Sequence, residues 1–133
     1  MSPAAPVWID RRAVVLIHEA QLAEHGGPSG IRDPALLESA LSAPEQLHHY
    51  ATPDLFDLAA CYGHRIANNH PFVDGNEGTA WVCTRLFLKL NGMDVEATIP
   101  RKIAVMLRVA AGEATESELA DWLREHGRGS GLS

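Results

Sequence analysis

The segment from Thr79 to Leu90 constrains the fold of this chain more than any other. Apolar side chains fall on most sides of the helix that this segment would form, so the helix needs neighbours all around it. Asn91 and Gly92 end it. A helix enclosed in this way is typical of the centre of a bundle. We therefore predict an all-α fold, a compact bundle of about six helices.

Capping residues and helix breakers mark the other helices. Asp10, Asp33, Asp54 and Thr115 can each cap a helix, and Thr115 begins a capping box. The predicted helices run from Asp10 to about Glu24, from Asp33 to a point before Pro44, from Asp54 to about His70, from Arg101 to Ala111, and from Thr115 to a point before Gly127.

Apolar residues at spacings of three and four predict which side of each helix is buried. The third stripe, continued by four residues, directs His70 inward if the helix extends that far. The predicted buried stripes are Ala13, Leu16, Ile17 and Ala20; Leu36, Leu37, Ala40 and Leu41; Leu55, Leu58, Ala59, Tyr62 and Ile66; Ile103, Met106, Leu107 and Ala110; and Leu119, Trp122 and Leu123.

The segments between the helices carry little regular pattern. Glu45 to Pro53 is expected to be an irregular link, and Asp94–Thr98 is at most a short β-hairpin. We expect one domain over residues 1–127, followed by a disordered tail or artificial linker at 128–133.

Length, composition and charge exclude several classes of protein. With 133 residues, of which 46% are hydrophobic, the chain can bury a core without metals or disulfides. The net charge of −6 and the lack of a Lys/Arg cluster argue against direct nucleic-acid binding. Cys61 and Cys83 fall in apolar helical stretches and should be buried, reduced thiols. No signal peptide or transmembrane segment is recognisable, so we expect a cytoplasmic protein with no membrane partner.

The loop that leads into the central helix carries the side chains suited to chemistry. Asp74, Gly75 and Asn76 favour a turn, and the N–H groups at the start of the following helix can bind an anion. His70 precedes the turn and could act as a base, while Asp74 could hold a cation. A base, a cation ligand and a phosphate contact could therefore meet here.

The same residues also allow a plainer interpretation. His70 could cap the preceding helix, Asp74 and Asn76 could form an ordinary turn, and Phe72 could belong only to the core. A metal hydrolase that uses His64 and His70 is a weaker alternative, because the two lie six residues apart and no third ligand has suitable spacing.

The string HPFVDGNEGTA, from His70 to Ala80, resembles the signature of the Fic/Doc family over its first seven positions. In that signature, His-x-Phe-x-(Asp/Glu/Asn)-(Gly/Ala)-Asn is followed by Lys-Arg or Gly-Arg. The resemblance to the death-on-curing (Doc) branch covers nearly the whole chain. It extends to His25–Gly27, Gly30–Asp33, Leu36–Glu38, Leu86–Leu88 and Asn91–Gly92.

The resemblance implies the toxin of a type II toxin–antitoxin pair. Doc toxins are kinases that transfer the terminal phosphate of ATP to a threonine of elongation factor Tu and so arrest translation, whereas the wider Fic family transfers AMP. The resemblance also implies Mg²⁺ as a cofactor and a Phd-like antitoxin segment as a partner. The site residues carried over are His70 as base, Asp74 for Mg²⁺, Phe72 as loop anchor, and Gly75, Asn76, Glu77, Gly78 and Thr79 for nucleotide phosphate.

The chain departs from the signature directly after Asn76. Glu77 and Gly78 stand where the family has Lys-Arg or Gly-Arg, so a negative charge replaces positive charge and a guanidinium fork is lost. Arg85, one to two helical turns further on, is expected to have a surface role instead. We therefore expect strongly impaired catalysis on an intact fold.

The alternative to an impaired enzyme is a non-catalytic module that binds the antitoxin. An amphipathic helix lying in a groove is the plausible mode of binding. Leu47, Tyr50, Leu55 and Phe56 are candidates to line such a groove, although each could equally be a core residue.

Overall fold

The computed structural model describes residues 5–130, and within that range it contains six helices and a two-stranded sheet. This confirms the predicted all-α class. No helix in this range is long and apolar enough to cross a membrane. The elements are α1 (Arg11–His25), α2 (Pro34–Tyr50), α3 (Leu55–Asn69), α4 (Asn76–Leu90), β1 (Met93–Val95), α5 (Ile99–Ala110), α6 (Glu116–His126) and β2 (Gly127–Gly129).

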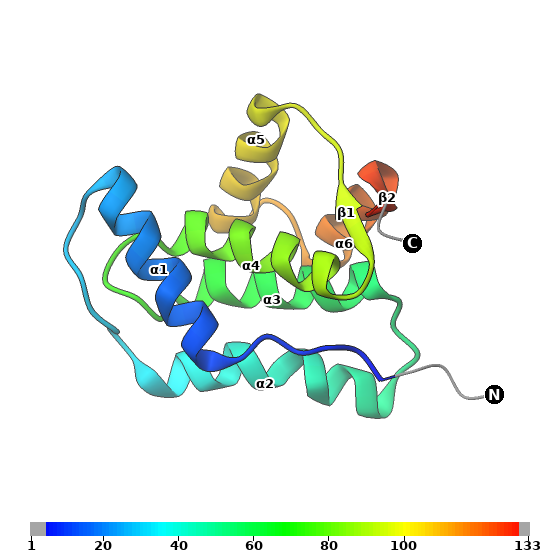
Figure 1. The fold of residues 1–133 in the computed structure, drawn as a ribbon, viewed down its shortest axis with the longest axis horizontal. Coiled ribbons are helices and arrows are strands. Elements are labelled where there is room, and N and C mark those ends of the chain that lie inside the picture. The colour runs from blue at the N-terminus through cyan, green and yellow to red at the C-terminus, as the bar shows by residue number, and fades with distance from the viewer. Residues whose placement is uncertain (1–4, 131–133) are drawn as a thin grey trace.

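Helices α3 and α4 run side by side through the middle of the molecule, with α2 along one side and α5 and α6 on the other (Figure 1). Tyr62 of α3 and Phe87 of α4 are fully buried and lie with ring centroids 5.2 Å apart. At Gly63 an added Cβ would lie 2.3 Å from Thr84 Oγ1, so the missing side chain allows the two helices to approach closely. The predicted central helix therefore shares the centre with α3.

The predicted helix caps are confirmed at the N-termini of four helices. The carboxylates of Asp10, Asp33 and Asp54 accept hydrogen bonds from backbone N–H groups in the first turns of α1, α2 and α3. Thr115 and Glu118 form the expected capping box at the start of α6. These helix starts are thus determined by local sequence.

The prediction that His70 points inward is wrong. The buried stripe of α3 is confirmed from Leu58 to Ile66, but the helix ends at Asn69 and His70 is exposed. His70 adopts the left-handed backbone conformation, with φ of 48°. This conformation breaks the helical periodicity on which the prediction depended, because it turns the chain away from the helix axis.

The predicted buried face of α1 is wrong for half of its residues, since Ala13 and Ile17 are partly buried against the core but the other two are not. Leu16 is 64% exposed and Ala20 is exposed, whereas Val14 and His18 are buried. Helix α1 packs mainly against α4 at the edge of the bundle. Its orientation therefore follows contacts with α4 and the loop before it, and a polar side chain replaces an apolar one on the buried side.

Helix α2 continues through Pro44 to Tyr50, so the predicted end before Pro44 and the irregular link from Glu45 are wrong. Pro44 has no N–H to donate to the carbonyl of Ala40, and such a proline normally disfavours a helix. Here Ala40 and Pro44 are both buried. Tertiary packing of this side of α2 offsets the missing hydrogen bond.

Half of the residues predicted to be buried on α5 are exposed. Met106 is buried and Ala110 is partly buried, as expected, but Ile103 and Leu107 are 55% and 52% exposed. The side of α5 that faces the core carries Val105, Met106 and Val109 instead. One part of its broad apolar surface is left uncovered.

The short sheet joins two segments far apart in the sequence. Strand β1 pairs antiparallel with β2, with Met93 opposite Gly129 and Val95 opposite Gly127. The β-structure near Asp94–Thr98 is as short as predicted, but its strands do not form a local hairpin. Arg128 and Gly129 belong to β2, so the prediction of a disordered tail or artificial linker is wrong for these two residues. Residues 131–133 of the predicted tail lie outside the described residues.

Both cysteines are buried and form no disulfide, which confirms the prediction for Cys61 and Cys83. Burial raises the pKa of each thiol to about 12. They are therefore protonated, unreactive side chains at neutral pH.

Candidate active site

The loop between α3 and α4 makes two sharp changes of direction. The left-handed conformation of His70 ends α3, and Gly75, with φ of 75°, precedes the first turn of α4. Helix α4 begins at Asn76, three residues before the predicted start at Thr79. The backbone N–H groups in its first turn have no acceptor within the helix and face outward at its end.

Asn76 holds the loop closed. Its Oδ1 accepts a hydrogen bond from the N–H of Phe72 at 3.0 Å, and its Nδ2 donates to the carbonyl of Phe72, also at 3.0 Å. The Asn76 side chain is 8% exposed and Phe72 is 1% exposed. The amide predicted to contact phosphate is thus engaged with the loop backbone, and Phe72 occupies the core.

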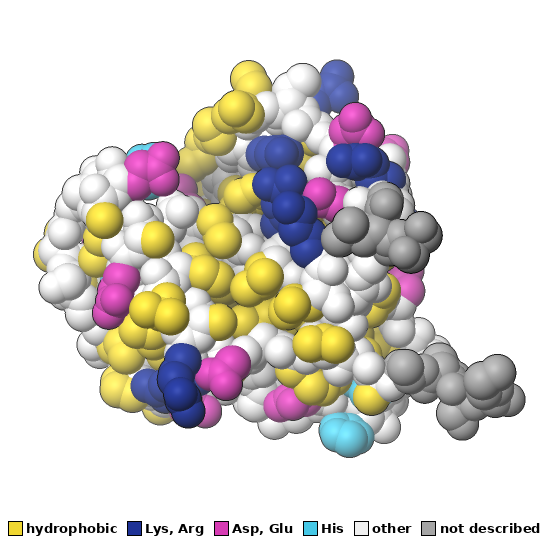
Figure 2. Space-filling view, in the orientation of Figure 1, with side chains coloured by type: hydrophobic (Ala, Val, Ile, Leu, Met, Phe, Trp, Pro, Cys, Tyr) yellow, Lys and Arg dark blue, Asp and Glu magenta, His cyan; other side chains and the backbone are white. Residues whose placement is uncertain are grey.

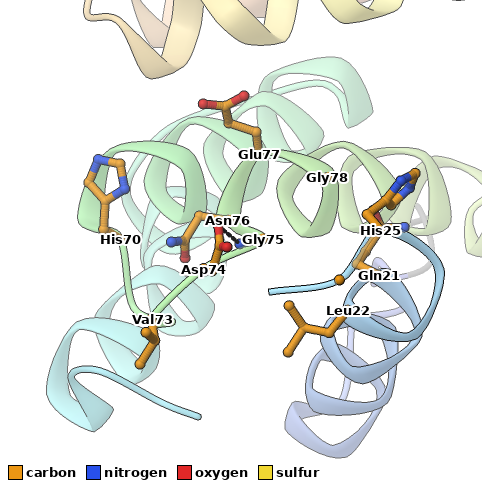
Figure 3. Close-up of a pocket in the computed structure, with 11 residues that line it drawn as sticks. Gln21, Leu22, His25, His70, Val73, Asp74, Gly75, Asn76, Glu77 and Gly78 are labelled. Atoms are coloured by element: carbon orange, nitrogen blue, oxygen red, sulfur yellow. Dashed lines mark hydrogen bonds between the residues drawn. The ribbon is translucent and has the colours of Figure 1, made fainter. Parts of the chain in front are cut away.

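A pocket of about 570 Å³ opens beside this loop, and α1 forms its other wall. Figure 3 shows His70 on one side, Gln21, Leu22 and His25 of α1 on the other, and Asp74 and Asn76 between them. The complete lining is Gln21, Leu22, His25, Gly26, His70, Val73, Asp74, Gly75, Asn76, Glu77 and Gly78.

The carboxylate of Asp74 is held at the pocket by its surroundings. Oδ1 accepts a hydrogen bond from the N–H of Gly75 at 2.8 Å (Figure 3). Oδ2 lies so close to Gly27 that a Cβ on that glycine would be 2.5 Å away. Gly27 therefore has to lack a side chain for Asp74 to keep this position.

The side chains of two residues outside the loop contact its backbone, and the sequence predicted a site role for neither of them. His18 of α1 places Nε2 2.8 Å from the carbonyl oxygen of Asp74. Arg32 donates to the carbonyl oxygens of His70 and Asn69 at 2.6 and 2.8 Å. The spacing of His18 four residues after Val14 could have placed it on the buried side of α1, but its contact with the loop had no local signal.

The segment that contains Arg32 also pairs with the loop. Ile31 and Phe72 form an antiparallel bridge, and the N–H of Val73 donates to the carbonyl of Gly30 at 3.1 Å. The glycine-rich connection between α1 and α2 thus forms part of the site.

Of the residues predicted to bind phosphate, Gly75, Asn76, Glu77 and Gly78 line the pocket, but Thr79 does not. The N–H of Thr79 donates to the carbonyl of Gly75 at 3.1 Å, and its side chain is completely buried. Its Oγ1 has no hydrogen-bond partner among the described residues. The available backbone donors are those of the helix start before Thr79.

The charges around the pocket are unfavourable for phosphate. Within residues 5–130, the lining contains the acidic residues Asp74 and Glu77 but neither lysine nor arginine. Arg85 lies outside this lining, and its Nε and Nη2 donate to Asp94 at 2.9 and 3.3 Å. The predicted surface role of Arg85 thus takes the form of an ion pair with Asp94.

The structure does not bring His64 to the pocket that His70 lines. His64 lies on α3, with Nδ1 3.9 Å from Glu116 of α6, and burial lowers its pKa. In the part of the chain that the structure describes, no group of three His, Cys, Asp or Glu residues could hold a metal ion. Asp74 therefore offers a single carboxylate, which suits a cation that is also held by a substrate's phosphates.

The sequence of this chain matches a known protein family and two of its members. Residues 8–88 match the model of the Fic/DOC family. The chain is similar to "Protein kinase doc" of Escherichia phage P1, with 31% identity over 117 residues that cover 87% of this chain and 92% of the relative. It is also similar to "Toxin Doc" of Mycolicibacterium smegmatis (strain ATCC 700084 / mc(2)155), with 39% identity over 74 residues, 54% of this chain and 57% of the relative. The chain therefore belongs to the Fic/Doc family.

Proposed function

We propose that this protein is the toxin of a type II toxin–antitoxin module and has the framework of a Doc-type protein kinase, acting in the cytoplasm. The single observation that carries the proposal is the pocket beside the loop, where His70, Asp74 and the first turn of α4 meet. Support for kinase chemistry comes from the phage P1 relative, whose name describes a protein kinase. The target proposed is a threonine of elongation factor Tu.

In the proposed reaction, His70, Asp74 and the backbone N–H groups at the start of α4 have separate roles. His70 accepts the proton of the threonine hydroxyl while the hydroxyl oxygen bonds to the terminal phosphorus of ATP, and ADP leaves as its bridging P–O bond breaks. Asp74 would hold Mg²⁺, which would offset phosphate charge. The backbone N–H groups of Asn76, Glu77 and Gly78 would contact phosphate oxygens.

We propose that this reaction is weak in the present chain because of Glu77 and Gly78. Two like unit charges about 4 Å apart repel by roughly 4 kcal/mol at an effective dielectric constant near 20, which gives the scale of the penalty from Glu77. The loss of a donor that stabilises the transition state typically lowers a rate by about 10² to 10³. Both changes oppose phosphate transfer.

The test is to replace Glu77→Lys and Gly78→Arg together and to assay ATP-dependent phosphorylation of elongation factor Tu. A side chain at residue 78 would meet Gln21, whose Oε1 would lie 2.2 Å from the new Cβ. A second version should therefore also carry Gln21→Ala. We expect phosphorylation activity to rise by a factor of at least about 10² in the version whose pocket has room for the new arginine. This factor is the typical effect of one donor that stabilises the transition state.

His70→Ala in the same background is the matched control, and it should abolish the gain. Equal activity before and after the double replacement would refute impairment by Glu77 and Gly78. The intact mass of the modified factor distinguishes phosphate transfer from AMP transfer, the reaction of the wider family.

A specific observation also favours the alternative function, an antitoxin-binding module. A groove of about 520 Å³ lies next to the site. The uncovered part of α5 forms one side of this groove. Figure 2 shows hydrophobic side chains along α5, next to a row of Lys and Arg side chains. The lining of the groove includes Trp81, Val82, Ile103 and Leu107, the basic residues Arg85 and Lys102, and the acidic residue Glu77.

We propose that an amphipathic antitoxin helix with acidic residues along one edge occupies this groove. Its apolar side would cover Ile103 and Leu107, and its acidic edge would face Lys102, since Arg85 is already paired with Asp94. Of the other candidates for such a groove, Leu47, Leu55 and Phe56 are partly buried against the core, the alternative that the sequence left open for them, and Tyr50 is exposed.

Ile103→Glu with Leu107→Glu should abolish co-purification with the antitoxin without lowering the melting temperature. The matched control is Leu16→Glu, which changes an exposed leucine on α1 that does not line the groove. Equal antitoxin retention by both variants would exclude this groove as the binding site.

A further inference from the structure

We propose that His18 is a positioning residue for the loop that carries His70 and Asp74. It lies on α1, more than fifty residues before the loop, and does not line the pocket. The inference rests on the proposed function only where the readout is binding of a metal–nucleotide complex. The structural part can be tested on the protein without any ligand.

The imidazole of His18 makes two kinds of contact with the loop. Its Nε2 lies 2.8 Å from the carbonyl oxygen of Asp74. Since a carbonyl oxygen can only accept, Nε2 is the nitrogen that carries the proton. The ring also stacks on Phe72, with centroids 3.8 Å apart and an angle of 9° between the planes.

Gly75 lies beside the same ring. A Cβ at this glycine would lie 3.6 Å from Cδ2 and 3.7 Å from Nε2 of His18. The single ring thus contacts Phe72 and Asp74 and leaves no room for a side chain larger than a methyl group at residue 75. His18 is only 3% exposed, so its ring cannot hydrogen-bond to solvent in place of the loop and has little space to adopt another rotamer.

This arrangement determines where Asp74 lies between α1 and α4. The hydrogen bond fixes the carbonyl of Asp74, while the stack fixes the residue two positions before it. The carboxylate of Asp74 is thereby presented at the pocket, and the turn at Gly75 is placed at the start of α4. A buried group that holds a functional side chain through its backbone is expected to matter for the precision of a site.

If His18 only packed against Phe72, any flat ring at this position would hold the loop equally well. His18→Phe keeps a flat ring against Phe72 but removes the donor to Asp74. His18→Gln keeps an N–H donor that can reach the same carbonyl but removes the ring. The two variants therefore separate hydrogen bonding from stacking.

The experiment measures amide hydrogen exchange over residues 71–78, the melting temperature, and the affinity for Mn²⁺ in the presence of ATP, with Mn²⁺ detected by its electron paramagnetic resonance signal. For His18→Phe we expect amide exchange in the loop to be about tenfold faster and the affinity for Mn²⁺ to be about tenfold weaker. A change of this size corresponds to the loss of one hydrogen bond. His18→Gln should recover most of both. The matched control is Val14→Ala, the fully buried neighbour on the same side of α1, which should lower the melting temperature without a selective effect on the loop.

The proposal is overturned if His18→Phe leaves loop exchange unchanged, or if both variants only reduce the melting temperature as Val14→Ala does. If the unchanged protein binds no Mn²⁺ with ATP, the proposed role of Asp74 in holding a metal–nucleotide complex fails. Loop exchange in the two His18 variants still decides the role of His18 in that case.

Discussion

Arg32 donates a hydrogen bond from Nε to the backbone carbonyl oxygen of His70, 2.6 Å away. Its Nη2 reaches the carbonyl of Asn69 at 2.8 Å. The guanidinium therefore satisfies carbonyl groups at the end of α3, at the point where the chain leaves the helix. Among the described residues other than glycine, His70 alone has a positive φ. The arginine thus supports the backbone conformation that presents the proposed base.

Arg32→Ala should destabilise the protein because two hydrogen bonds to the loop backbone are lost. The expected cost is only about 1 kcal/mol, since Arg32 is exposed and solvent partly replaces these bonds. Arg32→Lys should recover little, since an ammonium group cannot donate to two carbonyls as a planar fork does. The measurement is the free energy of unfolding in urea. Arg12→Ala, at an exposed arginine on α1, is the control. Equal values for the Arg32 and Arg12 variants would show that the carbonyl contacts contribute nothing.

Gly26 and Gly27 provide a matched test of the contact with Asp74. Both have positive φ, 80° and 118°, so an alanine is strained at either position. A Cβ at Gly27 would lie 2.5 Å from Asp74 Oδ2, whereas a Cβ at Gly26 would meet nothing within 4 Å. Gly27→Ala should therefore weaken Mn²⁺ affinity in the presence of ATP by roughly tenfold, equivalent to about 1.4 kcal/mol, and Gly26→Ala should not. Similar affinities in the two variants would indicate that Gly27 does not control the carboxylate.

Two helical glycines should respond oppositely to alanine. At Gly63 the new methyl group would meet Thr84 Oγ1 at 2.3 Å and Leu119 Cδ2 at 3.4 Å, both in the core, and overpacking of this kind typically destabilises by about 1–3 kcal/mol. At Gly78 the neighbour is the end of the flexible Gln21 side chain, so Gly78→Ala should be neutral or up to about 1 kcal/mol stabilising through helix propensity. Urea unfolding of the two variants measures the difference. A destabilised Gly78→Ala would show that Gln21 cannot move aside.

Asp94 should make stability depend on pH in the acid range. The hydrogen-bonded guanidinium of Arg85 lowers the pKa of Asp94 from 3.8 to about 2. Because the pKa is lower in the folded state, the stabilisation is present above about pH 4 and is lost as the pH falls from about 4 to about 2. Arg85 is 40% exposed on its side chain, so we expect Asp94→Asn to cost about 1–2 kcal/mol at pH 7.

The difference in unfolding free energy between Asp94→Asn and the unchanged protein should shrink as the pH approaches 2. Glu96→Gln is the control, because Glu96 is 76% exposed on its side chain and pairs with Arg128 only at the surface. A difference that stays constant between pH 7 and pH 2 would contradict the proposed origin of the effect.

Sequence reasoning succeeded where the cause of structure is local. The caps at Asp10, Asp33, Asp54 and Thr115 were identified because a capping side chain bonds to N–H groups within three residues of it. It failed at Pro44, where tertiary packing overrides a local helix breaker, and at the direction of His70, where one left-handed residue interrupts the period.

The loop from His70 to Gly78 could be predicted from the sequence because its groups are contiguous: the proposed base, the carboxylate, the turn and the helix start follow one another in the chain. Local sequence was therefore enough to identify these groups and most helix starts. The way the groups are held depends on the packed fold, since His18 and Arg32 come from distant segments and contact backbone atoms of the loop, which carry no sequence signal. Packing likewise left Ile103 and Leu107 exposed and paired β1 with β2. Such contacts depend on how the helices pack in space, and no local pattern encodes them.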